Sequence, residues 1–236
     1  KKNILELISN WDSFSFSTDN ITLCHSATVG SVIIMAFLKS KGIHTIISET
    51  PNYFATYNQA EILGFKMILI PTYYENGFQF KINDEVLIDN QPKAVWLTQP
   101  RTALGFNQNV EDISYILKRL SPNDFLIIDE ATEQFFPSVL ASFNPVKYPQ
   151  IIKVRSIFKG LGINGIRLAF IAHHESYRLE ISSHLENFLG ALDIFSIEHA
   201  IEIAKDVSKF KTLLSIANNQ VTNLRERAER LTKGTN

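Results

Sequence analysis

Lys159, Arg167 and Asp129 stand at points of the chain where charged side chains could act together on one ligand. Lys159 comes immediately before a glycine-rich segment, residues 160–165 (GLGING), and Arg167 follows that segment closely. Asp129 ends the apolar run 125–128, so its carboxylate should emerge at the carboxyl end of a strand. Open α/β sheets bind their ligands at that edge. The sequence therefore predicts a lysine, an arginine and a carboxylate around one ligand site.

Two further segments place polar and aromatic groups where a strand gives way to a helix. Ser26, Ala27 and Thr28 lie at one such junction. The N-terminus of a helix exposes unpaired N–H groups, which favour anions such as phosphate. Tyr53 follows Pro51-Asn52 at a second junction. These segments predict a phosphate-binding turn and an aromatic ring beside the three charged residues.

Residues 160–165 also match the G-x-G-x-x-G pattern of dinucleotide-binding folds. In those folds the pattern follows a strand and opens a helix whose N-terminus holds the pyrophosphate. Residues 166–171 (IRLAFI) are instead typical of a strand, and the motif lies late in the chain. This context argues against a nicotinamide or flavin site.

The elements that must position these residues alternate between strands and helices along most of the chain. Seven short segments rich in apolar residues are predicted as strands, namely 21–24, 44–48, 66–70, 94–98, 125–128, 151–154 and 166–172. Three segments with helical spacing are predicted as helices, namely 27–39, 53–63 and 109–120. Near-continuous apolar strands belong to sheets that are covered on both faces. We therefore expect an α/β protein with a mostly parallel sheet in three layers.

The pattern changes after Phe195. Residues 196–231 are predicted as one long helix, with a break expected near Asn218 and Asn219. No second segment carries a core of its own. We therefore divide the chain into a large ligand-binding domain, residues 1–195, and a helical segment, residues 196–236.

Composition excludes several classes of protein and of partner. The chain has 236 residues, of which 45% are hydrophobic and 20% charged, so it can bury a core and is not a disordered or collagen-like chain. Its 23 Lys and Arg residues against 24 Asp and Glu residues give a net charge of −1, which offers no footprint for nucleic acid or an anionic membrane. No apolar run approaches the roughly 20 residues that span a bilayer.

One cysteine, Cys24, cannot form an internal disulfide and favours a reducing compartment. No signal peptide follows Lys1, and the first residue is not methionine, so we expect a cytoplasmic protein, or a piece of one, with a trimmed start. His173 and His174 are neighbours on a predicted strand and should point to opposite faces. No cluster of metal-ligating residues has the spacing of a zinc site.

Several motifs, in their order and spacing, resemble those of the class I and II aminotransferases, which are pyridoxal-phosphate (PLP) enzymes of fold type I. Residues 156–167 (SIFKGLGINGIR) resemble the family pattern S-x-S-K-x-x-G-x-x-G-x-R, and residues 126–131 (LIIDEA) resemble its D-E-A-Y strand. Residues 51–53 (PNY) resemble P-x-Y, and residues 99–105 (QPRTALG) resemble N-P-x-N-P-T-G. The resemblance covers almost the whole chain, from about residue 21 to about residue 204.

The resemblance implies a role for each residue of the predicted site. Lys159 would form a Schiff base with the aldehyde of pyridoxal 5'-phosphate and later move the α-proton of an amino acid or amine substrate. Asp129 would pair with the protonated pyridine nitrogen, and Tyr53 would stack on the ring. The phosphate would be held by Ser26, Ala27, Thr28, Ser156 and Arg167. The family also implies a homodimer.

The sequence departs from the family pattern at residues expected to contact the cofactor. Thr102 stands where the family has an asparagine, and Thr132 stands where it has a tyrosine. Both family residues hydrogen-bond the phenolic oxygen of the cofactor, so the two threonines would occupy those places. Phe158 replaces the second serine of the lysine motif. The N-terminal arm and the small C-terminal domain of the family are not recognisable, so the chain is either part of a longer protein or has lost that half.

Three hypotheses follow from these residues. The first is a PLP-dependent aminotransferase-like enzyme. The second is a catalytically inactive module of the same fold that serves as a sensor or scaffold. The third keeps the cofactor but carries out decarboxylation, racemisation or elimination, because these reactions share the same lysine chemistry.

Overall fold

Seven strands form one sheet in the part of the chain that the computed structural model describes, which comprises residues 2–78, 80–87, 91–102, 104–105, 107–133, 138–163 and 165–232. Their spatial order is β1 (Ile21–Cys24), β7 (Ala169–Ala172), β6 (Ile151–Ser156), β5 (Phe125–Asp129), β4 (Lys93–Thr98), β2 (Thr45–Thr50) and β3 (Lys66–Pro71). β7 runs antiparallel to both of its neighbours, and the remaining pairs are parallel. The predicted mostly parallel sheet is confirmed.

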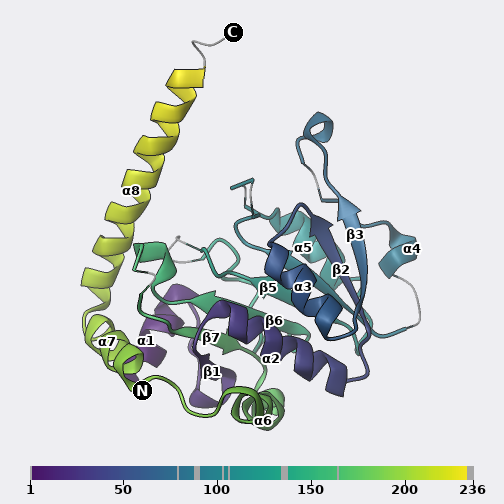
Figure 1. Cartoon of the computed structure of the whole chain (residues 1–236), viewed down its shortest axis with the longest axis horizontal. Helices are drawn as coiled ribbons and strands as arrows, with labels where there is room; N and C mark the ends of the chain where they lie inside the picture. The colour runs from purple at the N-terminus through teal and green to yellow at the C-terminus, as the bar shows by residue number, and fades with distance from the viewer. Residues whose placement is uncertain are drawn as a thin grey trace.

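Helices cover both faces of this sheet (Figure 1). One face carries α2 (Ala27–Ser40), α3 (Phe54–Ile62) and α6 (Arg178–Leu189), and the other carries α1 (Lys2–Trp11), α5 (Val110–Leu117) and α7 (Ile194–Ala204). The short helix α4 (Asp84–Leu87) buries Leu87 on the second face. Alternate residues of each central strand enter the two cores, as Trp96 and Val95 of β4 do. All residues of β4 and β5 are consequently buried, which explains their continuous apolar runs.

The C-terminal helices differ from the prediction. The chain forms α7 and then α8 (Val207–Thr232), with the break at Lys205 and Asp206. Asp206 Oδ1 accepts a hydrogen bond from Lys209 N at 2.9 Å, which is the contact of a helix N-cap. The predicted break near Asn218 and Asn219 is wrong, because both residues lie within α8.

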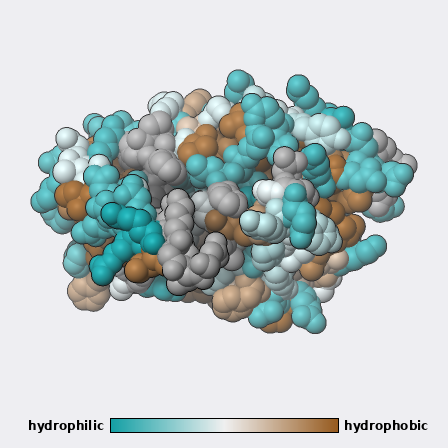
Figure 2. Space-filling model, turned by 90° about the horizontal axis from the view of Figure 1, so that it is seen from above, coloured by the Kyte–Doolittle hydropathy of each residue, from teal (hydrophilic) through white to brown (hydrophobic). Residues whose placement is uncertain are grey.

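The first part of α8 packs on the body of the molecule, whereas the rest projects away from it (Figure 1). Phe210 and Leu214 are buried in the same cluster as residues of α1 and α7. No described helix is long and apolar enough to cross a membrane. On the face shown in Figure 2, hydrophobic side chains lie in separate patches among hydrophilic ones.

The last predicted strand is shorter than expected. β7 contains Ala169–Ala172, whereas residues 166–168 precede it as irregular backbone, and Ile157 N donates to Leu168 O at 3.1 Å. His173 follows β7 and is fully buried, with its Nε2 2.9 Å from Thr22 Oγ1. Among the described residues, no group of histidine, cysteine and carboxylate side chains could hold a metal ion.

Candidate functional site

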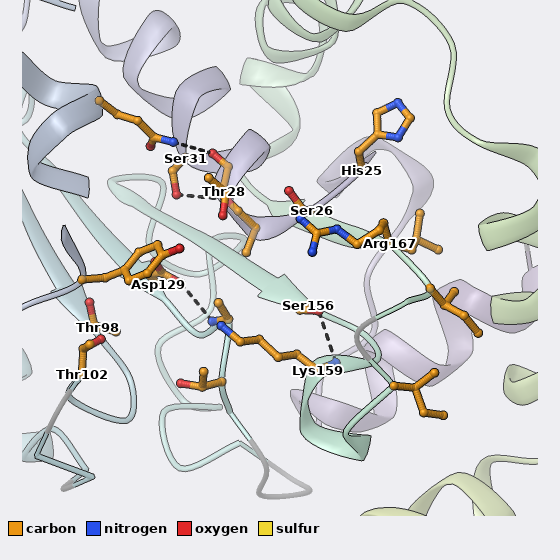
Figure 3. Close-up of a pocket in the computed structure, with 18 residues that line it drawn as sticks. His25, Ser26, Thr28, Ser31, Thr98, Thr102, Asp129, Ser156, Lys159 and Arg167 are labelled. Carbon is orange, nitrogen blue, oxygen red and sulfur yellow. Dashed lines mark hydrogen bonds between the residues drawn. The ribbon is translucent and has the colours of Figure 1, made fainter. Parts of the chain in front are cut away.

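A cavity of about 410 Å³ opens at the carboxyl edge of the parallel strands, where the ends of β4, β5 and β6 meet the N-terminus of α2 (Figure 3). The structure brings all ten residues of the predicted site to its wall: Ser26, Ala27, Thr28, Tyr53, Thr102, Asp129, Thr132, Ser156, Lys159 and Arg167. These residues come from distant parts of the chain. Their register is set by the sheet, in which Thr98 at the end of β4 pairs with Asp129 at the end of β5.

The N-terminus of α2 supplies the anion-binding part of the cavity. Ser26 is its N-cap, and Ser26 Oγ accepts a hydrogen bond from Val29 N at 3.2 Å. The side chain of Arg167 lies beside Ser26, and Ser156 lies close below them (Figure 3). The helix end and a guanidinium therefore point at the same space, an arrangement that suits a phosphate group.

Asp129 places a carboxylate deep in the cavity. It is the last residue of β5 and is 4% exposed. Asp129 Oδ1 accepts a hydrogen bond from Ala131 N at 2.9 Å. Burial raises the pKa of Asp129 from 3.8 to about 6, against the lowering effects of this hydrogen bond and of the charge on Lys159. A cationic partner in the cavity would favour the ionised carboxylate.

Lys159 enters the cavity from a turn that follows β6. It begins the short 3-10 helix Lys159–Leu161, and Lys159 N donates to Ser156 Oγ at 3.3 Å. Gly162 ends this turn with a φ of +71°, a backbone conformation that favours glycine. The Lys159 side chain extends toward Asp129, and its Nζ lies 6.0 Å from the centroid of the Tyr53 ring (Figure 3). An amine, an aromatic ring and a carboxylate thus share one space.

Tyr53 and Thr102 belong to the loops that follow β2 and β4. Asn52 Oδ1 accepts hydrogen bonds from Tyr53 N and from Thr98 Oγ1, both at 2.6 Å. Thr102 precedes β5 in the sequence, whereas Thr132 follows the end of β5, three residues after Asp129. The two threonines line the same cavity, so either hydroxyl could reach a ligand there.

The cavity wall contains residues that the sequence analysis did not assign to the site, including His25, Gln59 and Thr98. Thr98 could have been found, because it ends a predicted strand at the same edge as Asp129. Gln59 Nε2 donates to Thr28 O at 3.1 Å, which fixes the helix end, but no sequence signal marks that contact. Two residues of the quoted motifs, Ala103 and Asn164, lie outside the described residues.

Comparisons with known proteins identify the family of the chain. The family model described as aminotransferase class I and II matches residues 1–235. Histidinol-phosphate aminotransferase of Buchnera aphidicola subsp. Diuraphis noxia is 28% identical over 169 residues, which cover 71% of this chain and 46% of that protein. L-serine phosphate decarboxylase of Sulfurospirillum multivorans is 25% identical over 167 residues, which cover 67% of this chain and 42% of that protein.

The fold is shared with solved structures at lower sequence identity. The crystal structure of an aromatic aminotransferase from Pyrococcus horikoshii OT3 superposes with a TM-score of 0.80 at 18% identity, covering 98% of this chain and 64% of that chain. The chain spans about half the length, or less, of the curated relatives that it matches, with 46%, 38% and 49% of three histidinol-phosphate aminotransferases covered.

Proposed function

Since the chain belongs to the aminotransferase class I and II family, whose members are PLP-dependent enzymes of fold type I, we propose that it takes part in amino-group transfer from an amino acid or amine. The observation that carries this proposal is the single cavity in which Lys159, Asp129 and Arg167 meet the N-terminus of α2. A histidinol phosphate-like amino donor is one candidate, because several curated relatives are named histidinol-phosphate aminotransferase.

The residues of the cavity fit pyridoxal phosphate. Its phosphate matches the N–H groups at the start of α2 with Ser26, Ser156 and Arg167. Its pyridine nitrogen matches Asp129, a buried carboxylate that accepts a hydrogen bond from the Ala131 backbone and that burial leaves partly protonated near pH 6. Its aldehyde matches Lys159 Nζ, and Tyr53 offers a flat apolar face close to that amine.

The proposed mechanism assigns each side chain one task. The chemistry supplied by the bound cofactor is that of an electron sink next to the reacting carbon. Lys159 Nζ would hold the cofactor through its aldehyde, and as a free amine it would accept the α-proton of the substrate. Asp129 would keep the pyridine nitrogen protonated, which strengthens that electron sink. Arg167 and the α2 terminus would anchor the phosphate.

An absorption spectrum of the purified protein with added pyridoxal phosphate tests the proposal. We expect a band of bound cofactor that changes when an amino donor is added, together with formation of the carbonyl product, which is an oxo acid from an amino acid and a ketone or aldehyde from an amine. Because one relative is named a decarboxylase, release of CO₂ is measured alongside the spectrum. Binding without response to any amine would favour a non-catalytic module, and the absence of cofactor binding would overturn the proposal.

We further propose a homodimer in the cytoplasm. The dimer is typical of the family, and the compartment is supported by the single cysteine, which is buried and free. Size-exclusion chromatography with light scattering tests the oligomeric state, and a monomer at micromolar concentration would contradict it.

A further inference from the structure

A buried ion pair joins the two loops that carry Tyr53 and Thr102. Glu49 is the next-to-last residue of β2, and Arg101 lies three residues after the end of β4. Arg101 Nε donates to Glu49 Oε2 at 2.5 Å, with the two side chains 6% and 0% exposed. Tyr53 follows Glu49 by four residues, and Thr102 is the residue after Arg101. Each member of the pair therefore lies within four residues, along the chain, of a residue of the cavity wall.

Gln108 extends this pair into a network that fixes the loop after β4. Gln108 Nε2 donates to Glu49 Oε1 at 2.8 Å and to Thr98 O at 3.0 Å. Gln108 N donates to Gln99 Oε1 at 2.7 Å. Both carboxylate oxygens of Glu49 are thus bonded to this loop, on either side of Thr102. Arg101 Nη1 also donates to Phe78 O, which connects the loop after β3.

The loop after β2 is bonded to the same strand ends. Tyr57 Oη donates to Glu49 O at 2.7 Å, so α3 begins against the backbone of Glu49. Asn52 connects Tyr53 N with Thr98 Oγ1, and Asn52 Nδ2 donates to Ser48 Oγ at 3.1 Å. The position of Tyr53 relative to Thr102 is therefore set by side-chain bonds between the two loops and not by the strand ladder alone.

The charge of this pair is held at an energetic cost. Burial raises the pKa of Glu49 above its ordinary value, although Arg101 and Gln108 lower it. The desolvation cost of a buried ion pair can exceed its Coulombic attraction. A protein with apolar residues of similar volume at those positions is therefore often no less stable. What charged groups provide is a fixed geometry, because each bond is directional.

We propose that Glu49 and Arg101 are positioning residues of the cofactor site, whose ion pair holds Tyr53 and Thr102 in the places where both contact the cofactor. This inference rests on the proposed function, since it concerns residues that would touch pyridoxal phosphate. Neither Glu49 nor Arg101 would touch it. Their effect reaches the cofactor through the two loops.

A comparison of two buried ion pairs tests the proposal. Glu49→Gln removes the charge and places an amide against the donor groups of Arg101 and Gln108. Asp124→Asn is the matched control, because Lys93 and Asp124 form a buried pair, 3.5 Å apart and 3% and 1% exposed, at the amino end of the same strand β4. We expect Glu49→Gln to weaken pyridoxal phosphate binding by about tenfold, because interaction free energies between neighbouring groups are commonly of that size. Asp124→Asn should leave binding unchanged.

The circular dichroism of the bound cofactor supplies a readout that general loss of stability does not move. At saturating pyridoxal phosphate, the band per bound cofactor should change in Glu49→Gln and not in Asp124→Asn. Equal affinity and an identical band in both variants would overturn the positioning role while leaving the proposed function intact. If the unaltered protein binds no pyridoxal phosphate, both proposals fail.

A double-mutant cycle tests whether the two residues act as one unit. Arg101→Gln should weaken pyridoxal phosphate binding to a similar extent. The double variant, Glu49→Gln with Arg101→Gln, should lose no more affinity than the single variant that binds the cofactor less tightly. Additive losses would contradict a shared positioning role. If a single variant fails to fold, Glu49→Asp keeps the charge but shortens the side chain, and unchanged affinity with an unchanged band in that variant would equally contradict the proposal.

Discussion

At the scale of single residues, Lys159 is held by few contacts of its own side chain. It is exposed, and its turn is shaped by the backbone of Phe158, Lys159 and Gly162. Exposed substitutions away from special features change stability by about 0.5 kcal/mol or less. We therefore predict that Lys159→Ala leaves the free energy of unfolding within that range and abolishes covalent attachment of pyridoxal phosphate.

Borohydride reduction followed by peptide mapping checks this prediction. The pyridoxyl group should be found on Lys159 in the unaltered protein and on no peptide of the variant. Lys41→Ala is the matched control, because Lys41 lies outside the cavity, with its Nζ 2.6 Å from Glu180 Oε1, and its loss should leave the labelling of Lys159 unchanged. Labelling that persists in Lys159→Ala, or that maps to another lysine, would show that a different amine carries the cofactor.

Thr102 and Thr132 form the second prediction at this scale. The threonine side chains are shorter than the asparagine and tyrosine side chains of the family pattern. Their hydrogen bonds to the phenolic oxygen of the cofactor should therefore be weaker or water-mediated. Weaker bonds to an ionised oxygen leave that form less favoured. We predict that Thr102→Asn with Thr132→Tyr shifts the pH at which the spectrum of the bound cofactor changes.

A spectral pH titration of the unaltered protein and the double variant, both saturated with cofactor, measures this shift. Far-ultraviolet circular dichroism controls for the fold, because the new tyrosine ring must fit within the cavity. Superimposed titration curves with an intact fold would mean that the two threonines do not face the cofactor oxygen.

At the scale of elements, the approach of α2 to the sheet depends on Gly30. A Cβ at this position would lie 2.7 Å from Val154 Cγ2 and 3.2 Å from Cys24 Sγ. Overpacking of this kind costs about 1–3 kcal/mol, and the better helix propensity of alanine offsets up to about 1 kcal/mol of it. We predict that Gly30→Ala lowers the free energy of unfolding and also weakens pyridoxal phosphate binding, because the first turn of α2 must move.

Urea unfolding and cofactor titration check the two parts of this prediction. Gly165→Ala is the matched control, since nothing lies within 4 Å of a Cβ there, and it should be nearly neutral in unfolding. If Gly30→Ala is destabilised but binds pyridoxal phosphate normally, the N-terminus of α2 does not hold the phosphate in the way proposed.

The central strands were predictable from sequence because burial on both faces requires continuous runs of apolar residues. Predicted strands at 94–98, 125–128 and 151–154 correspond to β4, β5 and β6 with small differences at their ends. The ends of these strands then fix where Asp129 and Ser156 emerge. The site was therefore predictable to the extent that it depends on strand ends and on the turn after β6.

Other features leave little or no trace in the local pattern. Only Ile181 and Leu185 of α6 are buried, so its periodicity is weak, whereas α1 has helical spacing that a search for amphipathic segments could have found. Arg155 of β6 is fully buried, and Arg155 Nη2 bonds Asp12 Oδ1 at 2.7 Å across 143 positions of the chain. Such a pair, like that of Glu49 and Arg101, follows from tertiary packing and not from any local pattern.

At the scale of the whole molecule, two buried groups, one at the end of β5 and one just after β7, oppose each other in the pH dependence of stability. The pKa of Asp129 is raised from 3.8 to about 6 by burial, so the folded chain holds more protons there than the unfolded chain. Stability from this group is lost as pH rises from 3.8 to about 6. The pKa of His173 is lowered from 6.5 to about 4 by burial, so stability from it is gained as pH rises from about 4 to 6.5.

The structure explains why His173 resists protonation. Its Nδ1 lies 2.9 Å from His174 O, which only accepts hydrogen bonds, so Nδ1 carries the proton and Nε2 accepts from Thr22 Oγ1. A proton added to Nε2 would place a charged imidazolium in the core, where burial disfavours the charged form and lowers the pKa of His173. Asp129 lines the cavity, where a ligand could contact it, whereas His173 is not among the residues that line the cavity.

We therefore predict opposite slopes when either group is removed from the cofactor-free protein. Relative to the unaltered chain, Asp129→Asn should gain stability as pH rises from 4 to 6 by up to about 3 kcal/mol, and His173→Gln should lose a similar amount, since one pH unit of pKa difference corresponds to about 1.4 kcal/mol. Urea unfolding at several pH values measures both differences, and subtracting the unaltered protein removes contributions from other carboxylates such as Glu49.

Saturating pyridoxal phosphate should reduce the difference for Asp129→Asn, because a cationic partner favours the ionised carboxylate, and should leave that for His173→Gln unchanged. Difference curves that stay level for Asp129→Asn would mean that its carboxylate is already ionised and solvated in the empty cavity, and the buried partner assigned to the pyridine nitrogen would have to be sought elsewhere.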